Sequence, residues 1–75
     1  MAMVISDEVR SRAQRALTCS PFYELRELKV QQHEDALFIS GFVSSFYHKQ
    51  LAQEVVRSVC AGIEVINSIQ VETGR

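Results

Sequence analysis

The sequence lacks the features by which membrane, secreted and nucleic acid-binding proteins are usually recognised. No apolar run approaches the roughly 20 residues that a membrane-spanning helix needs. The segment Met1–Glu8 has neither a basic head nor a sustained apolar stretch, so it is not a signal peptide, and we expect the chain as written to stay in the cytoplasm. Eight Lys and Arg residues are balanced by nine Asp and Glu residues, so no basic excess favours nucleic acid or anionic lipid.

Cysteine and glycine are scarce, which excludes several kinds of site. Cys19 and Cys60 form no metal-binding pattern and are too few for a disulfide scaffold. We expect two small buried thiols; the alternative is a disulfide between two helix ends, which needs Cα atoms within about 7 Å. Three scattered glycines form no phosphate-binding loop, and we expect no cofactor.

The chain has two histidines, and neither falls in a catalytic motif. His33 precedes Glu34 and Asp35, a combination that would suit a proton or metal site but that we interpret as a solvated turn. His48 lies at the edge of an apolar helical stripe, where we expect it to cap or pack. Because no Ser-His-acid order is present either, we predict that the chain is not an enzyme and holds no metal.

The sequence does contain enough apolar residues for one small folded domain. Apolar residues make up 47% of the chain and charged residues 23%, which is a globular composition. We expect a single domain over residues 1–75, with a core from 7 to 71 and short frayed ends. A core of this size is marginal, and assembly is a common source of further stability, so we expect a homo-oligomer.

Two stretches have the periodicity of amphipathic helices. The first spans residues 6–19, begins at Ser6 or Asp7 and ends before Pro21. The second begins at residues 44–45 and ends near Gly62, which suits the left-handed C-terminal position. The apolar stripes are Val9, Ala13, Ala16 and Leu17 in the first helix, and Leu51, Ala52, Val55, Val56 and Val59 in the second.

An aromatic pair follows the proline. We expect Phe22 and Tyr23 to pack the end of the first helix onto a sheet, and an exposed recognition pair is the alternative. The order Ser-Pro-Phe-Tyr at 20–23 is echoed by Ser-Ser-Phe-Tyr at 44–47. Because one copy should lead into a strand and the other should begin a helix, we interpret the echo as coincidence.

Alternating patterns predict three strands, over residues 25–32, 37–43 and 63–71. The polar break between the first two predicts a hairpin. It lacks Asn-Gly or Asp-Gly, so we expect a loop longer than two residues, with His33 or Asp35 in the left-handed region. Gly41 in mid-strand indicates close approach by another element, and the simplest candidate is a helix crossing that face.

The order of elements is therefore helix, strand, strand, helix, strand. This αββαβ order predicts an α+β fold in which two helices pack on one face of a three-stranded mixed sheet.

Several short motifs in this order resemble those of the BON domain, a family named for bacterial osmotically induced and nodulation proteins. The motifs are Leu37-x-Ile39-x-Gly41-x-Val43-Ser44-Ser45, then Leu51-Ala52, Gly62-Ile63, Val65-x-Asn67 and Ile69-x-Val71. The resemblance spans about residues 7–71, and the run 43–53 is similar to a bacterial subgroup of short BON proteins. Two loops depart from the family pattern: residues 34–36 lack its Asp-Gly turn, and the segment from Gly62 to Val65 is one residue shorter.

The resemblance implies an αββαβ domain used for attachment, with no catalysis. It also implies phospholipid binding, which has been proposed for several members of the family. The family offers no motif of ligand-binding residues to carry onto this chain, and the glycines that match its pattern, Gly41 and Gly62, are structural.

The candidate binding surface is the sheet face turned away from the helices. Phe38, Phe42 and Ile66 should share this face, bordered by Lys29, Gln31, Ser68 and Gln70. A contiguous apolar patch on an open face is typical of an interface. Our first hypothesis is self-association or binding of a protein partner, and our second is contact with a phospholipid surface, as the resemblance implies.

RNA binding is the remaining alternative for a small α+β domain. Phe38 and Phe42 could stack bases. The chain lacks both the Gly-x-x-Gly clamp and the strand signature that combines aromatic and basic residues, so we expect no nucleic acid partner.

Overall fold

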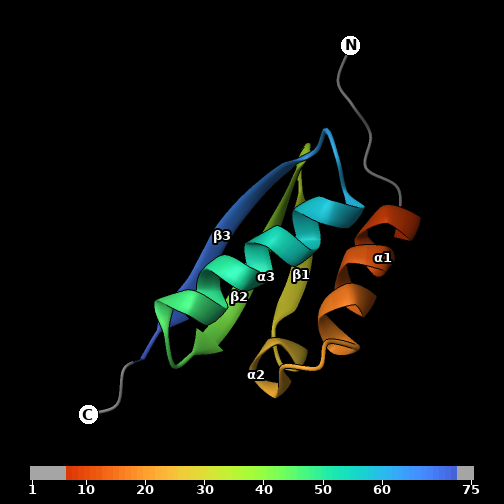
Figure 1. Cartoon of the computed structure of the whole chain (residues 1–75). Coiled ribbons are helices and arrows are strands. Elements are labelled where there is room, and N and C mark those ends of the chain that lie inside the picture. The colour runs from red at the N-terminus through yellow and green to blue at the C-terminus, as the bar shows by residue number, and fades with distance from the viewer. Residues whose placement is uncertain (1–6, 73–75) are drawn as a thin grey trace.

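The computed structural model describes residues 7–72, and its elements follow the predicted order with one addition (Figure 1). The predicted cap at Ser6 and the outer parts of the predicted frayed ends lie outside the described residues. The elements are α1 (Asp7–Thr18), α2 (Tyr23–Arg26), β1 (Lys29–His33), β2 (Ala36–Val43), α3 (Phe46–Val59) and β3 (Glu64–Val71). The addition is the single turn α2.

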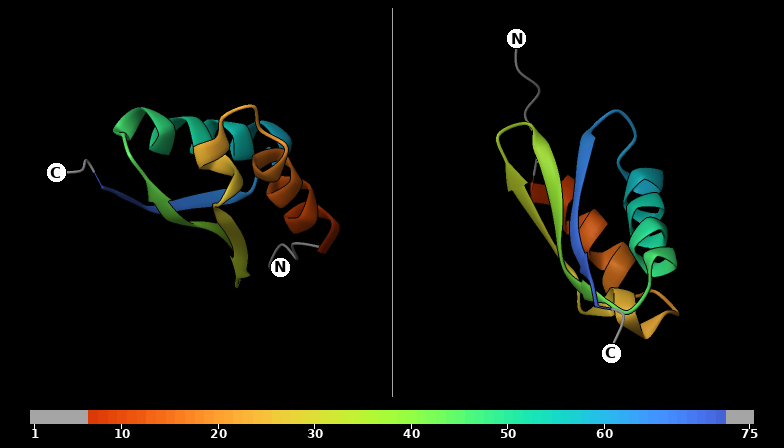
Figure 2. Two further views of the ribbon diagram at one scale, coloured as in Figure 1. Left: turned by 90° about the horizontal axis from the view of Figure 1, so that it is seen from below. Right: turned by 90° about the vertical axis from the view of Figure 1, so that its left-hand side faces the viewer.

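The three strands form one mixed sheet in the order β1-β2-β3. β2 is central, and it pairs with β1 in antiparallel and with β3 in parallel orientation. The helix α3 carries the chain from the end of β2 back to the start of β3, and α1 and α3 cover the same face of the sheet (Figure 2). The predicted α+β class, with two main helices on one face of a three-stranded mixed sheet, is confirmed.

The core lies between that sheet face and the two long helices. It is formed by the predicted stripes, because Ala13 and Leu17 of α1 and Ala52 and Val56 of α3 are completely buried. The sheet and its connections contribute Leu25, Leu28, Val30, Leu37, Ile39, Val43 and Ile69 to the same cluster. Alternate residues along β2 and β3 are buried on this face, and no element within residues 7–72 covers the other face of the sheet.

The prediction of a strand beginning at residue 25 is wrong, because residues 23–26 form α2 and β1 begins at Lys29. Leu25 and Leu28 are both buried, and their spacing of three fits a helical turn better than a strand. The turn begins where the hydroxyl of Ser20 accepts a hydrogen bond from the backbone N of Phe22, at 3.0 Å. Only from Leu28 to Val30 does the spacing become that of a strand.

The hairpin between β1 and β2 is tighter than predicted. His33 pairs directly with Ala36, which leaves Glu34 and Asp35 as a two-residue loop. The non-glycine residue with positive φ in this loop is Glu34, at +57°, and not His33 or Asp35. A short loop with left-handed geometry matches the twist of the flanking strands even without Asn-Gly.

Gly41 is required by a close neighbour, as predicted, but the neighbour is not a helix. A Cβ atom built on Gly41 would lie 2.7 Å from Cδ2 of Leu28, and the φ of Gly41 is +134°. Leu28, in the connection between α2 and β1, therefore crosses this face of β2. Both the contact and the φ value exclude a larger side chain here.

Both ends of α3 have the predicted signals. The Ser45 hydroxyl accepts a hydrogen bond from the backbone N of His48 at 3.2 Å, and Gly62 has a φ of +86°.

The expectation of two buried thiols is half wrong, because Cys60 is buried and Cys19 is exposed. Both thiols are free.

Candidate functional site

The open sheet face brings two of the three predicted site residues together. Phe38 pairs across the sheet with Ile66, and both side chains are half-buried. Phe42 lies four residues further along β2, opposite Gln70, which is roughly 13 Å away along a strand. Phe42 is 61% exposed. The predicted patch therefore consists of one flat pair and one separate, protruding ring.

Phe38 is partly covered by a histidine from the neighbouring strand. The rings of His33 and Phe38 meet edge to face, with centroids 5.9 Å apart. Together with Gln31, Ser40 and Ser68 they line a shallow hollow on the open face. His33 is also 3.9 Å from the Glu34 carboxylate, with both side chains strongly exposed, which is the geometry of a solvated turn.

The exposed large hydrophobic side chains of residues 7–72 are all aromatic and come from two short segments. They are Phe22 and Tyr23 at the start of α2, and Phe42, Phe46 and Tyr47 around the junction of β2 and α3. Their exposed fractions range from 40% to 71%. We call this group the aromatic end, because α2 and that junction lie at the same end of the molecule (Figure 1).

His48 and Glu24 join the two segments. The His48 ring meets Phe22 edge to face at 6.1 Å and Tyr47 at 5.4 Å between centroids. Glu24 of α2 accepts hydrogen bonds from the backbone N of Ser44 at 2.7 Å and from its hydroxyl at 2.6 Å. These contacts hold the turn α2 against the start of α3 and so position the aromatic rings.

Hydrogen bonds at this junction favour the ionised form of Glu24. The Ser44 hydroxyl, followed by the Ser44 backbone N–H, lowers the pKa of Glu24 below its ordinary value. His48 Nδ1 lies 2.8 Å from the Ser45 hydroxyl and 3.8 Å from the Glu24 carboxylate. His48 thus packs between Phe22 and Tyr47, and the capping residue of α3 is its partner Ser45.

The sequence interpretation missed most of the aromatic end. Phe22 and Tyr23 were expected to pack onto the sheet, but Tyr23 is 71% exposed and Phe22 contacts α3 instead. Phe46 and Tyr47 were not singled out as site residues. The signal was the echo between residues 20–23 and 44–47, because both segments lead into a helix and the structure sets these two helix starts side by side. The interpretation as coincidence overlooked this relationship.

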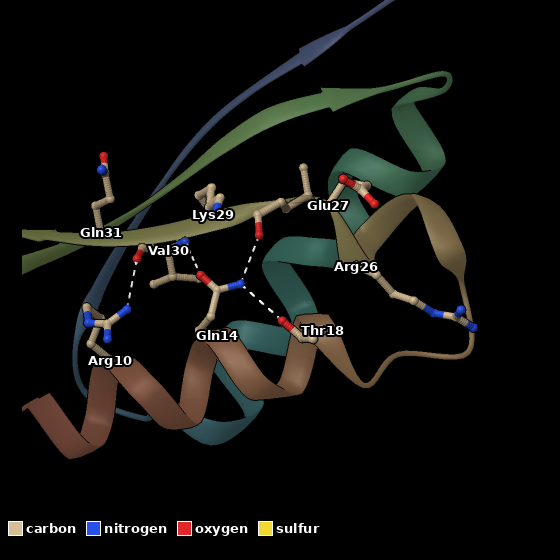
Figure 3. Close-up of a pocket in the computed structure, with 9 residues that line it drawn as sticks. Arg10, Gln14, Thr18, Arg26, Glu27, Lys29, Val30 and Gln31 are labelled. Atoms are coloured by element: carbon tan, nitrogen blue, oxygen red, sulfur yellow. Dashed lines mark hydrogen bonds between the residues drawn. The ribbon is translucent and has the colours of Figure 1, made fainter.

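A second hollow lies between α1 and β1 (Figure 3). Its centre is occupied by Gln14, whose Nε2 donates to the Leu28 carbonyl at 2.9 Å and whose Oε1 accepts from the Val30 N at 2.8 Å. Arg10 donates to the Val30 carbonyl at 3.4 Å. Because these polar groups pair with backbone, we assign them a structural role.

The described residues contain no cluster that suggests metal binding. Between residues 7 and 72, no three His, Cys, Asp or Glu side chains are placed to hold an ion together. Burial raises the pKa of the Cys60 thiol, which makes it a poor nucleophile. None of the helices in the same range has the length and hydropathy to cross a bilayer.

Comparison with known proteins agrees with the fold and its motifs. The model of the BON domain matches residues 5–73 of the 75-residue chain. No curated protein is a significant match. The match covers every strand and helix described above, so the chain belongs to the BON family, whose members are non-enzymatic binding domains.

Proposed function

We propose that this domain is an attachment module that binds a protein surface, including that of a second copy, through its open sheet face and aromatic end. The observation that carries the proposal is the position of Phe42. Its ring is 61% exposed, stands on the same face as Phe38 and Ile66, and borders a hollow shared with Tyr23. Phe42 is the residue where the two apolar surfaces meet.

The energetic argument rests on exposed aromatic area. Covering one such side chain contributes roughly 1.5–3 kcal/mol, and aromatic residues dominate the energetics of protein interfaces. Five exposed aromatic side chains in a 75-residue chain are more than scattered surface residues would supply. Because hydrogen bonds to Glu24 fix α2 against the α3 start, the rings are presented on a rigid base.

Charge favours a protein surface over an anionic bilayer. The hollow beside Phe42 is lined by Glu24, Glu27 and Glu72, together with Tyr23, Val43 and Ser44, and no Lys or Arg takes part. Carboxylates around an inserting ring would be repelled by anionic headgroups. Phospholipid binding, the alternative suggested by the family, is therefore treated as an outcome of the experiment.

The test compares wild type with Phe42→Ser, and uses Lys29→Ser as a control. Lys29 is an exposed residue at the border of the same face, so its replacement changes the rim but not the aromatic surface. The mass of each protein in solution is measured by analytical ultracentrifugation. Each is also sedimented with phosphatidylglycerol vesicles and with phosphatidylcholine vesicles. We expect wild type and Lys29→Ser to exceed the mass of one chain, and Phe42→Ser to be a single chain.

Three other results would change the conclusion. A wild-type single chain that sediments with neither vesicle contradicts both self-association and the lipid assignment. If the Phe42→Ser variant keeps the mass of the wild-type oligomer, the contact between copies lies elsewhere on the molecule. Sedimentation of wild type but not Phe42→Ser with vesicles assigns the surface to lipid.

A further inference from the structure

The two edges of the sheet differ in whether side chains pair with their outward N–H and C=O groups. At β1, side chains of α1 occupy the edge: Gln14 pairs with the Val30 N and the Leu28 carbonyl, and Arg10 reaches the Val30 carbonyl (Figure 3). An edge strand whose polar groups are covered in this way cannot accept another strand there. α1 therefore closes the β1 edge at its centre.

The β3 edge has no comparable cover among residues 7–72. The backbone N of Glu72 donates to the Val43 carbonyl at 2.8 Å, so residue 72 faces β2. The N–H and C=O groups of successive residues in a strand point alternately to its two neighbours. The residues whose N–H and C=O groups face away from β2 are therefore Val65, Asn67, Ile69 and Val71. Of these groups, the N–H of Ile69 meets a side chain, the Asn67 Oδ1 at 3.2 Å.

The composition of β3 offers little of the usual protection beyond the charged Glu64 at its start. Its eight residues, Glu64–Val71, contain no Lys, Arg or Pro and pair along their full length with β2. Natural edge strands are normally short, charged, bulged or covered, since an exposed regular edge is a template for another strand. An edge that is long, regular and open in a folded domain has the features of a strand-addition site.

We propose that the β3 edge binds an extended segment of a partner protein by strand addition, and that this segment carries a basic residue at each end. Main-chain hydrogen bonds to the outward groups of Val65, Asn67 and Val71 supply the attachment. The exposed carboxylates of Glu64 and Glu72 mark the two ends of the edge. Lys or Arg opposite them provides charge complementarity.

The same two carboxylates disfavour a second copy of the chain as the occupant. In a self-pairing centred on Ser68, antiparallel strands would place Glu64 opposite Glu72 at both ends. In a parallel pairing in register, each glutamate would face itself. Like charges directly opposite each other destabilise a strand pair. Glu72 also borders the hollow beside Phe42, but the main-chain groups of Val65, Asn67 and Val71 that this site uses take no part in that hollow.

The experiment uses two synthetic peptides of the same length. One is Lys-Thr-Val-Thr-Val-Thr-Val-Thr-Lys with blocked ends, whose two lysines have the same spacing as Glu64 and Glu72, and the other has Glu in place of both lysines. Binding is followed by amide hydrogen exchange and amide chemical shifts of the whole 75-residue chain. We expect the lysine peptide to slow exchange at Val65, Asn67 and Val71 by about tenfold when nine-tenths of the sites are occupied. Gln32, an outward-facing amide of the closed β1 edge, should not change.

Matched variants test whether the backbone donor matters. Val65→Pro removes an outward N–H that has no bond to β2, whereas Val65→Ala shortens the side chain and keeps the N–H. We expect Val65→Ala to bind the lysine peptide and Val65→Pro to bind it at least about tenfold more weakly. Should Val65→Pro fail to fold, the exchange data on wild type decide the matter alone.

Several results would overturn the proposal. These are equal binding of the two peptides, no slowing of exchange at the β3 amides, or equal binding by the two Val65 variants. Slowing that depends on protein concentration without peptide would show a second copy on this edge instead. Loss of oligomer in Phe42→Ser with normal peptide binding separates this site from the proposed function.

Discussion

Glu24 binds Ser44 with both of its carboxylate oxygens, at 2.7 Å to the backbone N and 2.6 Å to the hydroxyl. The two residues are 20 positions apart, one in α2 and the other immediately after the end of β2. This is the closest polar link between the segments that form the aromatic end. The arrangement of those rings therefore depends on the carboxylate being ionised.

Protonation of Glu24 should weaken the fold in acid. Its pKa is lowered in the folded state, so its stabilising contribution is fully present above the ordinary value of 4.5 and is lost as pH falls through the folded pKa. Glu24→Gln should be less stable than wild type at pH 7, and should lose less stability than wild type between about pH 5 and about pH 3. Urea unfolding at each pH measures this. Glu54→Gln, at an exposed position of α3, is the control, and an equal acid response of wild type and Glu24→Gln would contradict the prediction.

Gln14 should be important for stability although it belongs to no binding surface. Gln14→Ala removes the partners of the Val30 N and the Leu28 carbonyl, and groups left unpaired at a partly buried position cost about 1–3 kcal/mol of unfolding free energy. Gln14→Glu, which retains an acceptor for Val30 but no donor for Leu28, should lie between alanine and wild type. Equilibrium urea unfolding measures the difference, and a change below about 0.5 kcal/mol for Gln14→Ala would show that water replaces these bonds.

The two glycines with positive φ should differ in their tolerance of a methyl group. Gly41→Ala combines an unfavourable φ with a 2.7 Å approach to Leu28, and we expect a loss of about 2–4 kcal/mol in unfolding free energy. In Gly62→Ala the positive φ is also unfavourable, but the added Cβ would meet no neighbouring atom within 4 Å. We therefore expect a loss of about 1 kcal/mol in unfolding free energy. The difference between the two thermal denaturation curves reports the steric contact together with the less favourable φ of Gly41. Equal losses would mean that Leu28 moves aside without cost.

The two thiols should react at very different rates. Cys19 is exposed, whereas Cys60 is buried and burial raises its pKa, which reduces the thiolate available for alkylation. Iodoacetamide should modify Cys19 in the native protein at least about tenfold faster than Cys60, and both at similar rates in urea. Mass spectrometry of digested samples reads each site. Native modification of Cys60 as fast as Cys19 would show that the end of α3 opens readily.

Much of the fold follows from local patterns that need no long-range information. Ala13 and Leu17 in α1, and Ala52 and Val56 in α3, were placed in the core by helical periodicity alone. The α2 segment was misassigned because its apolar residues run directly into those of β1. Leu25 and Leu28 have the spacing of a helical turn, and Leu28 and Val30 have the spacing of a strand. A single turn is too short for its periodicity to be distinguished from that of a strand.

The candidate site was predicted less well, since it combines residues that are distant along the chain. Alternation placed Phe38, Phe42 and Ile66 on one face, but only the register shows that Phe38 meets Ile66 while Phe42 faces Gln70. Tyr23 and Phe42 border a common hollow because Glu24 binds Ser44, a contact that no local pattern encodes.

The sequence by itself determined the order of the long elements, the face that each buries, and the membership of the family. These depend on residue spacing, which is a property of neighbouring positions. Only the tertiary structure decided that Leu28 is the neighbour that makes Gly41 necessary, that Gln14 closes one sheet edge while β3 stays open, and that five aromatic rings gather at one end. Those relationships depend on how helices and strands are set against each other, and packing across the whole chain fixes them.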